Sequence, residues 1–223
     1  MPYRVVVVGG TKGIGKAIAD GAAKIGCSVI RLARRDSDVS LDLGWRENRI
    51  ADAIERAAEI RAGIDWLVLS AGMGAYVSPL EMTEQRILKM FRTNTIGPIL
   101  VYRAALRHLI CSRGRVLFIS STVGDRGARG LSLYGASKSA IHGFVRSEAR
   151  GLASHGVAMN ALAPGWVNTD MTDRIEPGLK EAIVKSIPMR RMAEPDEIAS
   201  FALSILSAPH FLTGQILEMS GGA

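Results

Sequence analysis

Short apolar runs alternate along the chain with longer segments in which apolar residues recur every three or four positions. Such short runs are typical of strands buried on both faces of a parallel sheet, and the longer segments are typical of amphipathic helices. Strands are predicted at residues 5–8, 28–33, 66–69, 116–119, 157–162 and 215–219. Helices are predicted at residues 13–25, 45–61, 84–110, 134–154 and 195–206, with Gly97 and Pro98 bending or restarting the third of them.

This alternation of strand and helix favours an α/β fold. We expect a single doubly wound Rossmann-type domain over residues 1–223, with a parallel sheet of about seven strands and helices on both faces. No break in composition and no internal repeat marks a domain boundary.

The segment 171–192 is a candidate substrate lid. It carries Pro177, Gly178 and Pro188 around a short amphipathic piece, and it follows the carboxyl end of a predicted strand. Ligands bind at that edge of such sheets, and loops there commonly close over them. The apolar positions of the segment would either line a substrate pocket or pack on the sheet, and they are Met171, Ile175, Leu179 and Ile183.

Composition limits the classes of function. Of the 223 residues, 48% are apolar and 22% are charged, which is the profile of one soluble globular domain. Cys27 and Cys111 stand alone and the four histidines do not cluster, so we expect no disulfides, no metal site and a cytoplasmic location. Residues 198–217, the longest stretch without a charged side chain, are interrupted by Pro209 and Gly214, so no membrane span is expected.

The net charge leaves the partner open. Lys and Arg number 28 against 21 Asp and Glu, and the resulting charge of +7 suits nucleic acid, an anionic cofactor or an acidic partner. Aromatic residues make up only 5% of the chain, so few side chains could stack on bases. We therefore expect no nucleic-acid binding.

A glycine-rich motif lies between the first predicted strand and the first predicted helix. It reads Gly9-Gly10-Thr11-Lys12-Gly13-Ile14-Gly15. Glycines at this place let the backbone approach a pyrophosphate, and the helix N-terminus offers unpaired N–H groups and a partial positive charge. The motif predicts a dinucleotide site, and a plain glycine-rich turn is the alternative.

A second motif, Tyr134-Gly135-Ala136-Ser137-Lys138, places a phenol and an ammonium group one helical turn apart. A free tyrosine titrates at a pKa of about 10, so acid or base chemistry near neutrality needs a nearby cation. Ser120 and Ser121 stand at the end of a buried strand, where hydroxyls are expected to face a site. The alternatives are an ordinary exposed helix pair and a strand-end hydrogen bond.

In their order and spacing, these motifs resemble those of the classical short-chain dehydrogenase/reductase family, especially its 3-oxoacyl-[acyl-carrier-protein] reductase-like members. The resemblance runs from Val5 to Ala223, and it includes a Pro-Gly segment at residues 160–169 and a matching tail at residues 213–222. It implies an oxidoreductase whose catalytic residues are Asn94, Ser121, Tyr134 and Lys138.

The resemblance also implies a role for each of these four residues. A nicotinamide hydride would attack a carbonyl carbon, Tyr134 would donate a proton to its oxygen, and Ser121 would polarise it. Lys138 would lower the pKa of the tyrosine and hold the nicotinamide ribose. Asn94 would hold a water that connects Lys138 to solvent, or it would merely patch the helix interrupted near Gly97.

Cofactor choice depends on the end of the second predicted strand. An acid there would bind the ribose 2′-hydroxyl of NAD, and an arginine would accept the 2′-phosphate of NADP. Arg34 stands at this position and Lys12 adds a second cation, which favours NADP(H). Arg34 and Arg35 could instead be a solvated pair, with Asp36 as the ribose acid.

By the same resemblance, Asp42 would contact the adenine amino group, with the helix that usually precedes it absent from this chain. The cofactor contacts that the family pattern implies are Gly9, Thr11, Lys12, Gly13, Ile14, Gly15, Arg34, Asp42, Leu43, Ser70, Ala71, Gly72, Tyr134, Lys138, Pro164, Gly165, Val167 and Thr169.

Two departures from the family pattern concern the cofactor site. Leu69-Ser70-Ala71-Gly72 stands where the family usually has Asn-Asn-Ala-Gly, so the paired asparagine hydrogen bonds are lost and Ser70 is the candidate to replace one. Val8 stands where a threonine often begins the glycine motif. Both changes bear on the rigidity of the cofactor site more than on catalysis.

Substrate and partners are the least determined. A 3-oxoacyl thioester carried on acyl carrier protein or CoA ranks first, with other ketones, quinones and secondary alcohols as alternatives. A catalytically silent nucleotide-binding module is the remaining class. The resemblance implies a homotetramer. Arginines that would contact an acidic carrier, or would simply be solvated, are Arg113, Arg126, Arg129, Arg190 and Arg191.

Overall fold

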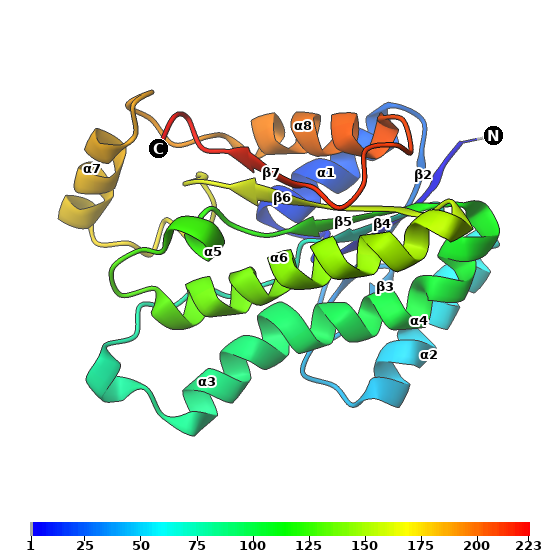
Figure 1. The fold of residues 1–223 in the computed structure, drawn as a ribbon, viewed down its shortest axis with the longest axis horizontal. Helices are drawn as coiled ribbons and strands as arrows, with labels where there is room; N and C mark the ends of the chain where they lie inside the picture. The colour runs from blue at the N-terminus through cyan, green and yellow to red at the C-terminus, as the bar shows by residue number, and fades with distance from the viewer. Residues whose placement is uncertain (1) are drawn as a thin grey trace.

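A seven-stranded parallel sheet runs through the middle of the protein, whose structure is a computed structural model that describes residues 2–223 (Figure 1). The strand order is β3-β2-β1-β4-β5-β6-β7, so β2 and β3 lie on one side of β1 and β4 to β7 lie on the other. The chain therefore reverses direction across the sheet between β1 and β4, which is where sheets of this kind bind ligands. The strands are β1 (Arg4–Val8), β2 (Ser28–Ala33), β3 (Val39–Ser40), β4 (Trp66–Leu69), β5 (Arg115–Ile119), β6 (Ala158–Pro164) and β7 (Ile216–Met219).

Helices cover both faces of the sheet, as expected for a single doubly wound domain. On one face lie α1 (Gly13–Lys24) and α8 (Pro195–Ser207), and on the other lie α2 (Glu47–Arg61), α4 (Gly97–Ser112) and α6 (Ser132–Leu152) (Figure 1). The shorter helical pieces are η1 (Pro79–Glu81), α3 (Glu84–Phe91), η2 (Arg92–Ile96), α5 (Val123–Arg126), η3 (Ala153–His155) and α7 (Pro177–Ser186). None of the helices within residues 2–223 has the length and apolarity that crossing a bilayer takes.

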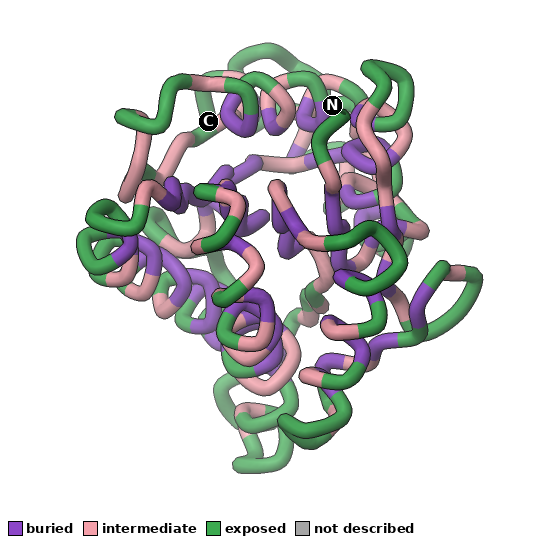
Figure 2. Tube along the Cα trace, turned by 90° about the vertical axis from the view of Figure 1, so that its right-hand side faces the viewer, coloured by how far each residue is buried: buried purple, intermediate pink, exposed green. Residues whose placement is uncertain are grey.

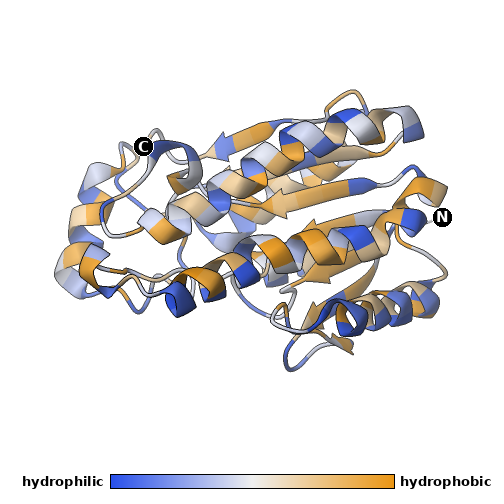
Figure 3. Cartoon of the chain, turned by 60° about the horizontal axis from the view of Figure 1, so that its bottom comes forward, coloured by the Kyte–Doolittle hydropathy of each residue, from blue (hydrophilic) through white to orange (hydrophobic). Residues whose placement is uncertain are grey.

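The core is divided by the sheet into two layers. Val6 and Val8 of β1 pack toward α2, α4 and α6, while Val5 and Val7 pack toward α1 and α8. Each such fully buried side chain contributes roughly 1.5–3 kcal/mol. Figure 2 shows the burial concentrated along the strands and the inner helix faces, and Figure 3 shows the strands as mostly hydrophobic.

All six predicted strands and all five predicted helices are present, with ends shifted by a few residues. The third predicted helix, 84–110, is divided into α3, η2 and α4. Pro98 has no N–H to pair with the Asn94 carbonyl, so the regular helical hydrogen bonds are interrupted before Gly97. The Gly97 N–H donates to the Arg92 carbonyl, five residues earlier, rather than to a carbonyl four residues earlier. The two-residue β3 and the one-turn α5 were not predicted, because neither is long enough to show a period.

The absence of a helix between β2 and Asp42 was predicted and is confirmed. Residues 34–38 form a bend that leads directly into β3. As a result, the exposed side chains of Arg34 and Arg35 follow directly on the carboxyl end of β2.

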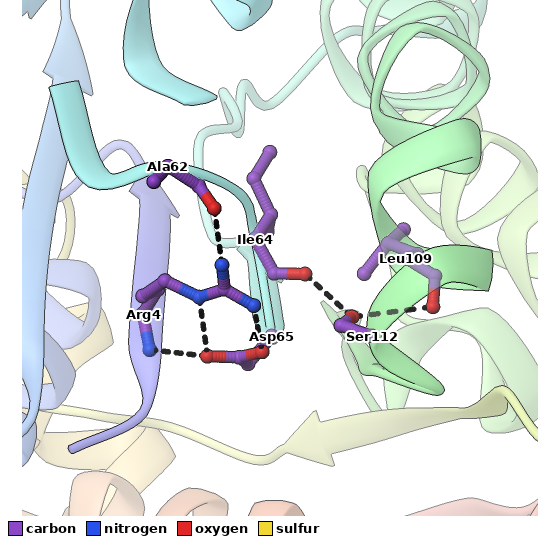
Figure 4. A network of polar contacts seen from close by, with 6 residues as sticks. All are labelled: Arg4, Ala62, Ile64, Asp65, Leu109 and Ser112. Carbon is purple, nitrogen blue, oxygen red and sulfur yellow. Dashed lines mark hydrogen bonds and ion pairs between the residues drawn. The ribbon is translucent and has the colours of Figure 1, made fainter. Parts of the chain in front are cut away.

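A group of polar contacts joins the amino ends of β1 and β4 and the end of α4 (Figure 4). Arg4 donates to both carboxylate oxygens of Asp65, at 2.6–2.8 Å, and also to the Ala62 carbonyl. Ser112 at the end of α4 donates to the carbonyl oxygen of Ile64 at 2.7 Å. Partial burial alone would raise the pKa of Asp65, but the hydrogen bonds from Arg4 hold that pKa below its ordinary value. These contacts lie at the amino ends of β1 and β4. The candidate site lies at the carboxyl ends of the same strands.

Candidate active site

The glycine loop between β1 and α1 is packed so closely that side chains are excluded. Gly9 has a φ of 80°, and a Cβ there would lie 2.7 Å from the Ala71 nitrogen. A Cβ on Gly15 would lie 2.2 Å from the carbonyl oxygen of Gly9 and 3.1 Å from the Ser70 hydroxyl. The loop therefore rests directly on the segment after β4, which carries Ser70 and Ala71 of the predicted cofactor contacts.

The N-terminus of α1 is free to bind an anion. Lys12 precedes the helix without a side-chain hydrogen bond to it, and the first turn contains no acidic residue. Unpaired N–H groups and the positive end of the helix dipole therefore face the loop. These features, together with the glycine cradle, fit the pyrophosphate of a dinucleotide.

The cations near the loop differ in what they contact. Lys12 lies 3.7 Å from Asp170, with both side chains exposed. Arg34 is exposed at the end of β2. Arg31, which was not singled out from the sequence, packs its stem against Gly10 and pairs with Asp20 at 2.7 Å. Arg31 is therefore held by a carboxylate, whereas Arg34 projects into solvent where a phosphate can reach it.

Asp42 and Leu43 follow β3 at the same edge of the sheet. One oxygen of Asp42 accepts a hydrogen bond from the Gly44 nitrogen at 2.8 Å, which fixes the carboxylate in a tight turn. Leu43 is buried, and a Cβ on Gly97 would lie 2.7 Å from its own Cβ. The turn thus packs against the start of α4.

Asn94 ties three elements together. Its side chain donates to the Met73 carbonyl at 2.9 Å and to the Ser137 hydroxyl at 3.0 Å, and it accepts from the Met73 nitrogen at 2.8 Å. Met73 lies on the segment after β4 and Ser137 on α6, so Asn94 ties its helix to both. It also donates to the Met90 sulfur at 3.2 Å, one turn earlier on α3. Ser137 stands inside the Tyr134–Lys138 motif, and its position there was the available sign that it would matter.

Gly72 lies where the cofactor and catalytic candidates meet. A Cβ on Gly72 would be 3.3 Å from the Asn94 side-chain oxygen and 3.6 Å from the Lys138 ammonium nitrogen. The segment Ser70 to Gly72 therefore connects the glycine loop to the motif on α6. Ser70 approaches Gly15 through its hydroxyl, in the place where the family pattern has an asparagine.

Lys138 is 6% exposed, and its ammonium nitrogen donates to the Ile119 carbonyl at 2.9 Å. The same nitrogen lies 5.8 Å from the centre of the Tyr134 ring. Burial lowers the pKa of Lys138 to about 8. The side chain is thus a buried amine that titrates close to neutrality.

Tyr134 faces Ser121 across the end of β5. Burial raises the pKa of Tyr134, and hydrogen bonding with the Ser121 hydroxyl offsets this only in part. The sequence led us to expect Lys138 to lower this pKa, but in the structure Lys138 is directed to the Ile119 carbonyl. The phenol is therefore protonated at neutral pH and can donate a proton.

The backbone also leaves the Ser121 hydroxyl able to donate. The Val123 nitrogen donates to Ser121 Oγ at 3.2 Å, so an accepting position of that oxygen is already filled. Its proton can then point toward Tyr134 or toward a substrate oxygen.

The Pro-Gly segment begins within β6 and continues past its end to the glycine loop. A Cβ on Gly165 would lie 3.0 Å from Ser220, and a Cβ on Gly13 would lie 3.3 Å from the Thr169 methyl group. Pro164 and Val167 are buried within this segment. The predicted Thr169 contact region therefore lies beside the predicted pyrophosphate loop.

Residues 171–192 contain α7. Some of their apolar side chains pack inward, and another borders the candidate site. Ile183 is buried and packs with Ile187 and Met192. Met171 is exposed, and its sulfur lies 3.1 Å from a Cβ placed on Gly74, beside the Tyr134 ring. One part of the segment therefore packs inward, while Met171 borders the space in front of Tyr134.

Comparisons with known proteins agree with this arrangement. The model of the short chain dehydrogenase family matches residues 3–180. Carbonyl reductase family member 4 of Danio rerio is 33% identical over 237 residues, covering 100% of this chain and 98% of the relative. The 3-oxoacyl-[acyl-carrier-protein] reductase FabG of Vibrio cholerae is 34% identical over 233 residues, covering 97% and 95% respectively. The crystal structure of the TT0495 protein of Thermus thermophilus is 31% identical with a TM-score of 0.93, covering 100% of this chain and 98% of that one.

Proposed function

The chain belongs to the short-chain dehydrogenase family and is an oxidoreductase, and from that premise we propose that it reduces a 3-oxoacyl thioester with NADPH. The observation that carries the proposal is the neutral phenol of Tyr134, which faces Ser121 and lies one turn from the buried Lys138. A proton donor and an aimed hydroxyl are what the developing charge on a carbonyl oxygen needs.

When bound, the nicotinamide nucleotide supplies the hydride. Gly9, Gly13 and Gly15 would hold its pyrophosphate against the uncapped start of α1, where a Cβ would fill the space. Segments 70–72 and 164–169 would hold further parts of its length, with Thr169 at the nicotinamide end and Asp42 and Leu43 at the adenine end.

The residues of this chain would then divide the proton chemistry among them. Ser121 donates a hydrogen bond to the carbonyl oxygen, and Tyr134 donates the proton that this oxygen takes up. Lys138 would hold the nicotinamide ribose and, once charged, would stabilise the phenolate that remains. Asn94 fixes the segment after β4 beside Lys138. By the family resemblance it would also hold a water that connects Lys138 to solvent.

NADPH is proposed over NADH on the basis of charge. Arg34 is exposed at the end of β2 without a helix after it, so its guanidinium can form a bidentate contact with a 2′-phosphate. Lys12 adds a second cation, and its exposed pairing with Asp170 can be exchanged for a phosphate at little cost.

The substrate class is proposed from the relatives and from charge. One relative is named a 3-oxoacyl-[acyl-carrier-protein] reductase and another a carbonyl reductase, so a carbonyl is common to both names. A net charge of +7 suits an acidic carrier or the phosphates of CoA. Arg126 and Arg191 are already paired with Glu218 and Glu197, so the exposed Arg129 before α6 is the better candidate contact.

The test is NADPH oxidation followed by absorbance with acetoacetyl-CoA, with simple ketones and quinones in a parallel panel and NADH as the competing cofactor. We expect the thioester to be reduced with the highest kcat/KM, and NADPH to be preferred. Turnover of another carbonyl in place of the thioester would leave the reductase function standing and contradict the substrate. Binding of NADPH without turnover of any carbonyl would contradict both.

We also infer a cytoplasmic homotetramer. Cys27 and Cys111 are free thiols, as is usual in a reducing compartment. By the family resemblance, the helices around Asn94 and Tyr134 would pair between subunits. Leu88 on α3 and Ile96 on η2, near Asn94 in the chain, are exposed apolar side chains that such pairing could cover. Sedimentation at micromolar concentration should give a tetramer, and a monomer would contradict the assembly.

A further inference from the structure

A polar cluster lies behind the candidate active site, with Ser120 and His142 buried and Asp125 exposed at its outer end. Ser120 Oγ is 2.7 Å from Nε2 of His142, and Nδ1 of the same ring is 3.1 Å from a carboxylate oxygen of Asp125. Ser120 follows β5, Asp125 belongs to α5, and His142 belongs to α6. Ser120 is recognisable from the sequence as a strand-end residue, but no local pattern points to Asp125 and His142 as its partners.

His142 is held in an apolar layer. It is 1% exposed, and Ile141 and Val145, the residues one before and three after it on α6, are core residues. Nδ1 has no hydrogen bond of standard geometry. The Asp125 carboxylate beside it is the group that offsets the cost of burying this ring nitrogen. A leucine would fill this space without burying a polar ring, so packing alone does not account for the imidazole and its polar contacts do.

The His142 ring also supports α5 from below. A Cβ on Gly124 would lie 2.8 Å from Cε1 of His142 and 3.1 Å from the Ser139 nitrogen. The Ser139 hydroxyl donates to the Gly124 carbonyl, which ties the same backbone to α6 a second time. The turn of α5 therefore rests on α6 with His142 as its base.

The cluster flanks Ser121, the residue proposed to polarise the carbonyl oxygen. Ser121 stands between Ser120, which contacts Nε2, and Val123, whose nitrogen donates to Ser121 Oγ at 3.2 Å. On the other side, the Ile119 carbonyl accepts from Lys138, one turn before His142 on α6. Fixing both ends of this short segment fixes Ser121 relative to the two candidates on α6.

We propose that His142 is a positioning residue, which through Ser120 and Asp125 holds the Ser121 hydroxyl in register with Tyr134. The inference rests on the proposed function, because it assigns His142 a part in carbonyl reduction. His142 itself does not contact the substrate. It acts by clamping the ends of β5 and α5 to α6.

The same three residue types form the triad of serine hydrolases, but the placement here excludes a nucleophile. Ser120 is 4% exposed, and its hydroxyl points under α6 to His142 rather than to the space in front of Tyr134. An acyl carbon has no approach to that oxygen, so the hydrogen bonds serve orientation alone.

The experiment compares His142→Leu, which removes both contacts, with His142→Gln, whose amide can reach Ser120. The control is His108→Leu, because His108 also pairs with a carboxylate, Glu55 at 3.3 Å, but lies on α4 away from the site. Each variant is measured for kcat, for KM of the carbonyl, for NADPH affinity and for amide hydrogen exchange of residues 121–126.

We expect His142→Leu to lower kcat about 10- to 100-fold, because small misplacements of catalytic groups cost that much, while NADPH affinity stays within about twofold. His142→Gln should recover most of the loss and His108→Leu should show none. Ser120→Ala should lower kcat in the wild type but not in the His142→Leu background, because the two residues act as a pair. Among the three histidine variants, amide hydrogen exchange over residues 121–126 should be faster only in His142→Leu.

The proposal is overturned if His142→Leu keeps kcat within about twofold of the wild type. It is also overturned if Ser120→Ala costs the same factor in both backgrounds, or if His142→Gln is as impaired as His142→Leu. A wild type that reduces no carbonyl would overturn the proposed function instead. The exchange result would then decide the clamp on its own, since unchanged protection of residues 121–126 in His142→Leu would refute it.

Discussion

The ammonium nitrogen of Lys138 lies 5.8 Å from the centre of the Tyr134 ring and donates its hydrogen bond to the Ile119 carbonyl. The two side chains are one helical turn apart, yet the cation is directed at the end of β5 rather than at the phenol. Burial sets their pKa values in opposite directions, raised for Tyr134 and lowered to about 8 for Lys138. At neutral pH the site therefore combines a protonated phenol with an amine whose pKa is about 8.

This relationship predicts a stability change with pH. The pKa of Lys138 is about 8 in the folded protein and 10.5 ordinarily, so between these values the unfolded chain binds the extra proton. The free energy of unfolding of the wild type should therefore rise from pH 8 to pH 10.5 by roughly 1–3 kcal/mol relative to Lys138→Met. Denaturant titrations of both proteins across this range measure it, and parallel curves would contradict the buried amine.

The glycine loop predicts a contrast between two glycines. Gly15→Ala should destabilise the protein by roughly 1–3 kcal/mol and weaken NADPH binding, because its Cβ would lie 2.2 Å from the Gly9 carbonyl oxygen. Gly143→Ala should instead stabilise the protein by about 0.5–1 kcal/mol, since a helix prefers alanine and no atom lies within 4 Å. Thermal unfolding and NADPH titration check both, and equal behaviour of the two variants would refute the cradle.

Arg34 is expected to select the cofactor. Arg34→Ala removes a charge-assisted hydrogen bond to the 2′-phosphate, so the Kd for NADPH should rise about 10- to 100-fold. The Kd for NADH, which lacks that phosphate, should stay the same. Fluorescence titration with the two nucleotides gives both constants. An equal loss for both, or none for either, would assign the phosphate contact to another residue.

The strands, the helices and the glycine loop could be predicted because each carries its own local signal. Val5 to Val8 is an apolar run, and Gly9 to Gly15 shows its chemistry by its spacing. The restart of helix 84–110 at Gly97 and Pro98 was predicted, and α4 begins there. The π-helical turn η2 before it was not predicted, because a shift of hydrogen bonds over five residues leaves no sequence period of its own. β3 is two residues long and is formed only by pairing with β2, so it has no period of its own.

The contacts of the site were less predictable, because they join residues far apart in the chain. Asn94 was identified by resemblance alone, and its partners Met73 and Ser137 depend on how α3, α4 and α6 pack. The direction of Lys138 toward Ile119 is likewise a tertiary result. A lone buried histidine such as His142 reads as a core residue until the elements that carry Ser120 and Asp125 are placed.

The Arg4–Asp65 pair predicts a second pH effect. Because Arg4 holds the pKa of Asp65 below its ordinary value of 3.8, the pair stabilises the folded protein above that pH and the contribution is lost as pH falls through the folded-state pKa. Asp65→Asn should cost roughly 1–2 kcal/mol at pH 7, after allowance for partial exposure of the pair. The gap between wild type and variant in urea titrations should close in acid, and a constant gap would contradict the linkage.

The central claim, that Tyr134 is the proton donor of a carbonyl reductase, is tested most directly by the Tyr134→Phe protein. NADPH binding and NADPH-dependent reduction of acetoacetyl-CoA would be measured side by side in wild type and variant. We expect the Kd for NADPH to stay within about twofold while kcat falls about 100-fold or more, because only the proton transfer is lost. Retention of wild-type turnover by Tyr134→Phe would contradict the account.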